Sequence, residues 1–447
     1  MFVCDRPAVT RWVVLAVLAL IGLSTAQAQQ LVTTGQSVGG VSIDAQGQLS
    51  NVSVAGAGAF EKLRLEAIPD GLRRPSELRK VSLKGLDAQI EKCLADHTPL
   101  PIEVQCLGGL QDIRYVLVYP EQQDIVLVGF GEGWKQDKRG NLVGATTGRP
   151  VLLLDDLVTA LRVMSGNVRG PMQCSIDPTA EGLQRLAAFA KQQRTIGSDP
   201  GAMAGSVEQT LGPQKITVAG VPATSHFAVV MVAADYRMKR ISMGLEPSPV
   251  AGLPSFMEYT RAGATGMGNM LPRWWLEPNY DSLRRDEQGL SWEIRGGSVK
   301  AMCENDYFDA QQIQHTGKAD AASQRWAEAM TARYPDLAKV EPVFGQLRNC
   351  MDLAVVAALL VKENLPEKAG ARFVHLTGES TPTAELNAPK QLASQATLAK
   401  KGKKWLIAAG GVSINPWTIV AKTETNPAPA AVRTKSAAPA GAAWYWD

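Results

Sequence analysis

The chain has 447 residues, of which 45% are hydrophobic and 20% are charged, and its formal net charge is +3. This nearly even balance between basic and acidic residues excludes the strongly basic character of most nucleic-acid-binding proteins. It gives no support for a strongly charged partner. This length predicts two or three domains.

The first 28 residues have the features of a secretory signal peptide. Arg6 and Arg11 precede an apolar run, residues 12–23, and Ala26–Ala28 follows as a small-residue cleavage site. We therefore expect export to the periplasm or beyond after cleavage near Ala28, an uncleaved anchor being the weaker alternative. No later window approaches the roughly 20 apolar residues of a membrane span, so none is expected after cleavage.

Five cysteines follow the predicted signal peptide: Cys93, Cys106, Cys174, Cys303 and Cys350. An odd number in an exported protein predicts at least one free thiol or an intermolecular bridge. Cys93 and Cys106 could pair if the chain between them folds back. The alternative is that all five are buried free thiols that pack as small hydrophobic residues.

The predicted N-terminal part, residues 29–165, combines hairpins and helices. Alternating apolar residues predict a hairpin that turns at 44–47 and a second one formed by 113–119 and 124–130. Helical spacing predicts a helix within 75–94, for which Ser82 can act as the N-cap, and another over 153–164.

The predicted central part, residues 166–262, contains two helices and then a strand–helix–strand unit within 215–249. Asp177 and Pro178 suit the start of the first helix, and Ser225 suits the N-cap of the helix in the unit. Helices that alternate with short apolar strands indicate an α/β layer.

The predicted C-terminal part, residues 263–420, begins with an antiparallel meander and continues with two helices. The second helix, 344–363, is apolar nearly all round, which is typical of a buried core helix. Two strands follow, and the Ala-, Pro- and Thr-rich residues 421–447 are expected to be a disordered tail. The chain as a whole is therefore predicted to have a mixed α/β (α+β) fold in two or three closely packed parts.

The sequence contains none of the S-x-x-K, H-E-x-x-H or Walker A motifs, so no catalytic residue is assigned. The four histidines lie far apart, and no two have the spacing of a metal-ligand pair. No metal site and no cofactor are predicted.

Polar residues crowd the helix of the central part. His226 and Asp235 are nine residues apart and hence on opposite sides of one helix, so they do not form a simple acid–base pair. His226 is interpreted as a capping or structural histidine. Asp235 and Lys239 have the spacing of an exposed ion pair worth a few tenths of a kcal/mol. Tyr236 and Arg237 complete this group of candidate binding residues.

A second candidate site is aromatic. Trp274, Trp275 and Trp292 occur close to Arg273, a combination that suits a peptide-binding or sugar-binding surface. The alternative is that these tryptophans belong to the core, because the adjacent Trp274 and Trp275 must point to opposite faces of a strand.

Several long strings resemble a family of exported bacterial proteins, best known from planctomycetes and recorded only as a domain of unknown function. They include VYPEQQDIVLVGFGEGW, CSIDPT, VAADYRMKRISMGLEPSPV, LPRWWLEPNY and GGVSINPW. The resemblance extends from about residue 65 to 420. It implies an exported location and a large α/β body, and it brings no activity, cofactor or catalytic residue.

These observations favour an exported, non-catalytic protein that binds or scaffolds an envelope protein or a glycan. The first alternative is a hydrolase directed at envelope material or polysaccharide, with a site built from Asp235, His226 and nearby arginines. The second is an accessory subunit of a larger extracytoplasmic assembly. Convergence of His226, a carboxylate and an arginine in one pocket would favour the enzyme, and an exposed tryptophan patch would favour the binding protein.

Overall fold

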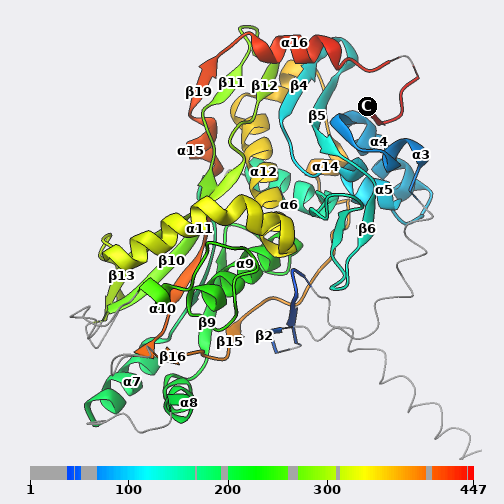
Figure 1. Cartoon of the computed structure of the whole chain (residues 1–447). Coiled ribbons are helices and arrows are strands. Elements are labelled where there is room, and N and C mark those ends of the chain that lie inside the picture. Colours follow the sequence, from blue (N-terminus) through cyan, green and yellow to red (C-terminus); the bar gives the residue numbers. More distant parts are fainter. Residues whose placement is uncertain are drawn as a thin grey trace, which may run out of the picture. The chain divides into compact units, whose positions relative to one another are not determined.

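A nine-stranded mixed sheet is the larger of the two main sheets in the computed structural model (Figure 1). Strands β10 and β18 pair in parallel at its centre, and the neighbours of this pair, β8 and β13, are antiparallel to it. In spatial order the strands are β1 (Val41–Ile43), β2 (Gln48–Asn51), β15 (Gln391–Leu392), β9 (Gln214–Ala219), β8 (Met172–Asp177), β18 (Ala409–Ile414), β10 (Met270–Asn279), β13 (Ser298–Phe308) and β14 (Ile313–Gln314).

The structure describes residues 38–44, 46–51, 68–166, 169–192, 200–259, 270–308, 313–398, 405–439 and 441–447. The predicted signal peptide lies outside these residues. Residues Ser37–Asp447 form one compact unit.

The second main sheet has seven strands, which come from the beginning, the middle and the end of the chain. In spatial order they are β19 (Thr423–Thr425), β11 (Leu283–Arg285), β12 (Ser291–Glu293), β4 (Tyr115–Tyr119), β5 (Asp124–Gly131), β3 (Ser76–Ser82) and β20 (Tyr445–Trp446). Two-stranded pairs are formed by β6 (Trp134–Gln136) with β7 (Leu142–Gly144), and by β16 (Thr397–Leu398) with β17 (Trp405–Leu406).

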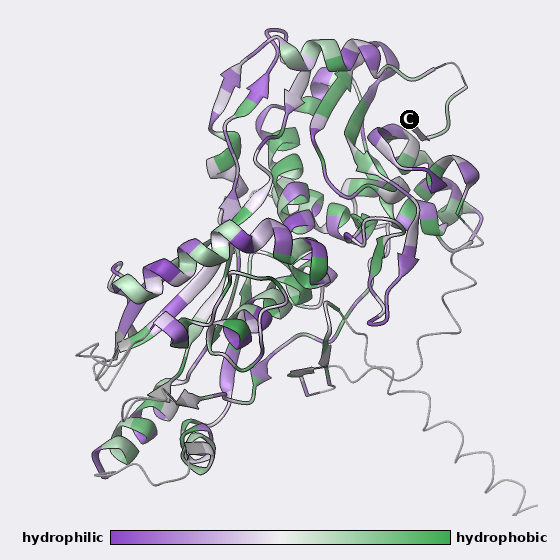
Figure 2. Ribbon diagram, in the orientation of Figure 1, coloured by the Kyte–Doolittle hydropathy of each residue, from purple (hydrophilic) through white to green (hydrophobic). Residues whose placement is uncertain are grey.

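Helix α12 (Pro342–Lys362) is the central helix of the core. It packs against α6 (Leu154–Ser165), α9 (His226–Ser242), α11 (Ala321–Val340) and α15 (Pro416–Val420). Its length and apolar composition would suffice to cross a membrane, contrary to the expectation that no later window comes close. However, 94% of its most apolar window is buried inside the protein, so the prediction of a core helix is confirmed. Figure 2 shows the hydropathy of each residue along the ribbon in the orientation of Figure 1.

Helices α9 and α11 cover the same face of the nine-stranded sheet. Helix α9 packs on β8, β18 and β10, and α11 packs on β13. The Ser225 side chain accepts a hydrogen bond from the Ala228 N–H at 3.2 Å, which confirms the predicted start of α9. The remaining α-helices are α3 (Asp70–Arg73), α4 (Leu83–Ala95), α5 (Ile102–Gln105), α7 (Ala180–Gln192), α8 (Pro200–Leu211), α10 (Phe256–Tyr259), α13 (Leu365–Ala369), α14 (Val374–Thr377) and α16 (Ala428–Lys435).

The mixed α/β fold is confirmed, but two local predictions are wrong. Residues 76–82 form strand β3 instead of a helix, and the helix begins only after Ser82, whose side chain accepts from the Gly85 N–H at 2.8 Å. The second strand of the predicted strand–helix–strand unit does not form, and the described residues 243–249 make turns and bends instead. At β3, pairing with the distant strands β5 and β20 outweighs the local helical pattern.

Residues 421–447, predicted to be disordered, contain β19, α16 and β20. Aromatic residues at the end of this segment fix it to the rest of the protein, despite the Ala- and Pro-rich composition. Trp444 and Tyr445 pack against the core, and the Asp447 carboxylate pairs with the fully buried Arg79 guanidinium at 2.9 Å.

None of the five cysteines after the predicted signal peptide, all of which lie in the described residues, forms a disulfide, so the alternative of thiols without a Cys93–Cys106 bond holds. Four of them are buried, and Cys303 is half-buried. They pack as small hydrophobic residues.

Candidate functional site

A pocket of about 380 Å³ lies where several segments far apart in the sequence meet. Its walls come from residues 111–114, from the turn at Arg149 and Pro150, from residues 294–298, and from α11 and α12. This volume is within the range of small-molecule sites.

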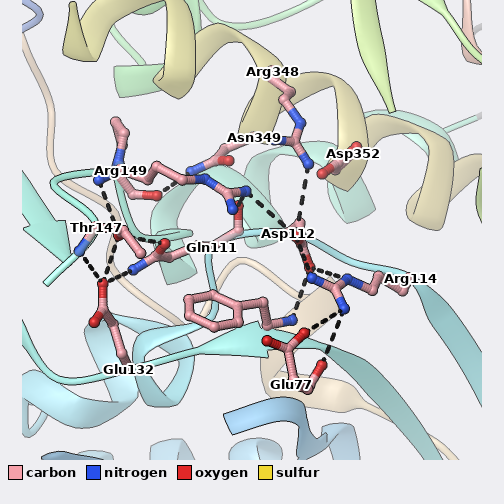
Figure 3. A network of polar contacts seen from close by, with 12 residues as sticks. Glu77, Gln111, Asp112, Arg114, Glu132, Thr147, Arg149, Arg348, Asn349 and Asp352 are labelled. Carbon is pink, nitrogen blue, oxygen red and sulfur yellow. Dashed lines mark hydrogen bonds and ion pairs between the residues drawn. The ribbon is translucent and has the colours of Figure 1, made fainter. Parts of the chain in front are cut away.

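Asp112 is the centre of the polar network in this pocket (Figure 3). Its Oδ1 accepts a hydrogen bond from the Phe130 N–H at 2.8 Å, which ties the residue to β5. A side chain at Gly129 would put its Cβ 2.0 Å from the Asp112 carbonyl oxygen. Glycine at 129 therefore lets the loop with Asp112 lie directly on the strand.

Three arginines surround the single carboxylate of Asp112. Arg114 approaches its Oδ1 at 3.2 Å, and Arg149 and Arg348 approach its Oδ2 at 3.3 Å and 3.8 Å. Burial lowers the pKa of Arg149, and the nearby positive charge of Arg348 lowers it further. The two guanidinium groups are thus crowded, with one carboxylate between them.

Arg114 differs from the other two arginines because it has a second acidic partner. Its Nη1 lies 3.1 Å from the exposed carboxylate of Glu77. Burial lowers the pKa of Arg114, but Asp112 and Glu77 outweigh this effect, so the pKa is raised.

A buried hydrogen-bond network holds the turn that carries Arg149. The Glu132 carboxylate is fully buried and accepts from the Gln111 amide at 2.8 Å and from the Thr147 N–H at 2.9 Å. The Thr147 hydroxyl in turn accepts from the Arg149 N–H at 3.2 Å. Burial raises the pKa of Glu132, but the hydrogen bonds from Thr147 and Gln111 outweigh it, so Glu132 stays ionised.

Helix α12 contributes a second acid to the pocket. The Tyr280 hydroxyl donates to Asp352 Oδ1 at 2.5 Å, and Asp352 is 1% exposed. Its other oxygen, Oδ2, has no hydrogen bond of ordinary geometry within the described part of the chain, although the Ile113 N–H lies close enough to lower the pKa slightly. Burial raises the pKa of Asp352 to about 6, against the opposing effect of Arg348.

The lining side chains carry more positive than negative charge. Arg114, Arg149, Lys339 and Arg348 face Asp112 and Asp352, which makes four cations against two carboxylates. Glu77 and Asp336 pair with Arg114 and Lys339 from outside the lining, but these pairs are solvent-exposed and hence weak. The arrangement suits an anion with two or more oxygen acceptors, because guanidinium groups bind such oxygens in pairs.

The tryptophans proposed as a binding surface do not form one. Trp274 and Trp292 are fully buried, and Trp274 packs edge-on against Phe256 and Trp326 at 4.9 Å and 5.1 Å between ring centroids. Trp275 points to the other face of β10, as expected, and donates to Glu277 at 2.6 Å. The exposed tryptophan patch is therefore wrong, and the core alternative holds for Trp274 and Trp292.

His226 contacts a carboxylate on a neighbouring helix. Its Nδ1 lies 3.0 Å from both carboxylate oxygens of Asp156 on α6, and its side chain is 13% exposed. Burial lowers the pKa of His226, but Asp156 outweighs this effect, so the pKa is raised. The contact joins α9 to α6 and does not involve Asp235.

Asp235 and Lys239 form a buried ion pair, so the prediction of an exposed pair is wrong. The Lys239 Nζ lies 3.0 Å from Asp235 Oδ2 and donates to the Ile176 carbonyl at 2.6 Å. The reason is that α9 is enclosed between the sheet and α12, which leaves almost no solvent-facing side. Burial raises the pKa of Asp235 to about 6, against the opposing effect of Lys239.

The other two candidates on α9 also make structural contacts. Arg237 binds Glu246 at 3.1 Å and Glu341 at 2.8 Å. The buried Tyr236 ring lies under the Arg240 guanidinium, 5.6 Å from it. Of the eight predicted binding residues, Arg273 and Trp275 line a pocket, which is a second one on the open face of the nine-stranded sheet.

The sequence interpretation missed Asp112, Arg149, Arg348 and Asp352. The first two belong to loops that show no motif. Arg348 and Asp352 had a usable signal, because they are charged residues one turn apart inside the most apolar helix of the chain. A buried charge in such a helix needs a partner or a function.

Comparison with known proteins agrees with the resemblance in the central part of the chain. Residues 174–256 match a family described only as "Protein of unknown function (DUF1598)". The DUF1598 segment extends from β8 through α9 and supplies Ser175, Asp177 and Thr217 to the second pocket. No curated protein and no solved structure matches the chain.

Proposed function

We propose that this chain is an exported binding protein of the cell envelope, and that its Arg149–Arg348 pocket holds the anionic group of a small ligand. One observation indicates that the ligand is an anion. Two crowded guanidinium groups share a single carboxylate in a pocket of about 380 Å³. A bound anion would relieve their repulsion and occupy donors that Asp112 leaves free.

The unpaired atoms of α12 support the same proposal. Arg348 Nε is buried and has no hydrogen-bond partner among the residues described. An unsatisfied donor of this kind costs about 1 to 3 kcal/mol, and more when it is charged. A carboxylate, sulfate or phosphate oxygen of a ligand would satisfy it.

Calorimetric titration with sulfate and with malonate tests this proposal, because one probe presents a tetrahedral anion and the other two planar carboxylates. We expect binding of at least one probe to the purified mature protein. Arg348→Gln should weaken it at least tenfold, which corresponds to about 1.4 kcal/mol. Arg325→Gln, which removes an exposed arginine outside the pocket, should leave it unchanged.

Failure of both probes to bind, or equal weakening by the two substitutions, would refute an anion pocket. Circular dichroism of both variants checks that the fold is retained.

A hydrolase is the second candidate, and Asp352 is the observation that favours it. A buried carboxyl group with a pKa of about 6 in a pocket is suited to general acid catalysis near neutral pH. Turnover of envelope polysaccharide by the purified protein, abolished in Asp352→Asn, would favour the enzyme. Binding without turnover would favour the binding protein.

The exported location rests on the N-terminal sequence, in which Arg6 and Arg11 precede the apolar run and Ala26–Ala28 follows it. Mass spectrometry of the protein isolated from its native cells tests it. We expect a mature N-terminus immediately after Ala28, in the envelope or the medium. An intact Met1 in the cytoplasmic fraction would overturn the export proposal and leave the pocket proposal standing.

A further inference from the structure

The second pocket, of about 390 Å³, lies on the face of the nine-stranded sheet opposite to α9 and α11. Because side chains alternate along a strand, every second residue of the central strands points into it. Among these are Ser175 of β8, Ser413 of β18, and Arg273 and Trp275 of β10. This second pocket is therefore separate from the pocket that is lined by Arg149 and Arg348, which we call the arginine pocket.

Three potential metal ligands meet at one side of this pocket. Glu304 and Asp306 are two residues apart on β13, so they share a face of the sheet, and His315 follows the short strand β14. One ligand atom from each of the three lies within 4.8 Å of the others. His315 Nδ1 is 2.8 Å from Asp306 Oδ1 and 3.3 Å from Glu304 Oε1.

These separations fit the ligands of a metal ion. Two atoms bonded to one metal at about 2.1 Å are about 3.0 Å apart when their angle is 90°, and about 3.4 Å apart when it is tetrahedral. The neutral imidazole offers one N–H, which can serve only one of the two facing carboxylates well. A divalent ion bound to the imidazole nitrogen in place of that hydrogen would contact both carboxylates.

Each carboxylate is held by its outer oxygen. Asp306 Oδ2 accepts from the Arg273 Nε at 2.7 Å, and Glu304 Oε2 accepts from the Gly317 N–H at 2.9 Å. The inner oxygens are thereby turned toward His315. Outer hydrogen bonds that orient carboxylate and histidine ligands are a general feature of metal sites.

The charge of this cluster also favours a cation. Glu304, Asp306 and Asp177 surround Arg273, whose Nη2 lies 2.7 Å from Asp177 Oδ1. Three carboxylates therefore face one guanidinium. The Asp306 carboxylate is fully buried, where an excess of negative charge is costly.

We propose that His315 Nδ1, Asp306 Oδ1 and Glu304 Oε1 bind a divalent transition metal such as Zn²⁺. Three protein ligands from imidazole and carboxylate groups, with water at the open position, constitute the ligand set of an open zinc site. The pocket of about 390 Å³ supplies room for that water and for an exchangeable ligand next to Trp275 and Ser175. Sequence spacing hides the site, because His315 is nine positions away from Asp306 and shows no ligand spacing with it.

Calorimetric titration of the mature protein with Zn²⁺ tests the proposal. We expect one site per chain, and at least tenfold weaker binding in His315→Gln. The matched control is His375→Gln, which replaces a histidine next to Ser380 in another part of the fold and should not change binding. Glu304→Gln is a second variant, which should also weaken binding without removing the histidine.

Absorption spectra with Co²⁺ provide an independent measurement. A Co²⁺ complex of the wild-type protein should show ligand-field bands that are absent from His315→Gln. The proposal is overturned if Zn²⁺ does not bind, or if His315→Gln and His375→Gln bind it equally. Sulfate binding at the arginine pocket is unaffected by either outcome.

Discussion

Arg348 and Asp352 lie one turn apart on the buried helix α12, and each leaves one polar atom without a hydrogen bond in the described structure. Their partners, Asp112 and Tyr280, come from segments far away in the chain. A core helix thus carries two charged side chains into a pocket. Such support is what a binding site requires.

Asp352→Asn should change the pH dependence of stability. The pKa of Asp352 is raised to about 6 in the folded state, so folding favours the protonated form and wild-type stability falls as pH rises from about 4 to 6. This group contributes a decline on the order of 2 to 3 kcal/mol. Urea unfolding at pH 4.5 and 7 should show a smaller decline in Asp352→Asn, and an unchanged decline would contradict this account.

Sulfate should bind more tightly at pH 5 than at pH 7.5. Protonation of Asp352 near pH 6 removes a negative charge from the pocket, while the charge of sulfate stays constant. Calorimetry at the two pH values measures the difference. Asp352→Asn should bind sulfate with nearly equal affinity at both, and a pH effect that survives this substitution would have to come from another group.

Lys239→Met should cost about 3 to 5 kcal/mol of unfolding free energy, because it leaves Asp235 charged and unpaired in the core. The double variant Asp235→Asn/Lys239→Met should recover part of this loss. Lys339→Met breaks an exposed pair with Asp336 and serves as the control, with an expected cost below about 1 kcal/mol. Equal costs for Lys239→Met and Lys339→Met would show that Asp235 is not enclosed as described.

The contact between His226 and Asp156 should stabilise the protein at low pH. The pKa of His226 is raised above its usual value of 6.5, so the stabilisation is complete below about pH 6.5 and is lost as pH rises through the folded-state pKa. Urea unfolding of wild type and His226→Gln at pH 6 and pH 8.5 measures this. The difference between the two proteins should be larger at pH 6, and a larger difference at pH 8.5 would contradict the ion pair.

Local sequence patterns sufficed for much of the fold. The apolar run of α12, the Ser225 cap of α9 and the hairpin of β4 and β5 are short-range features, and the structure confirms them. Strand β3 was mistaken for part of a helix because its order comes from pairing with β5 and β20, which local spacing does not record.

The candidate sites were harder to predict because every one of them is assembled from distant segments. Asp112 and Arg348 are 236 positions apart, and neither belongs to a motif. His315 looked isolated among four scattered histidines, yet it faces two acids of the neighbouring strand. The buried position of Asp235 depends on α12, which the sequence of α9 does not reveal.

The pairing of β20 with β3 also determines when the seven-stranded sheet can be completed during synthesis. Tyr445 and Trp446 form the edge strand of the seven-stranded sheet. The carboxylate that pairs with the buried Arg79 belongs to Asp447, which is 368 residues later in the chain. Contacts of such long range make folding slow. Strand β3 therefore acquires its outer partner only after residues 445 and 446 have been synthesised, so an N-terminal fragment without them would expose that edge of β3.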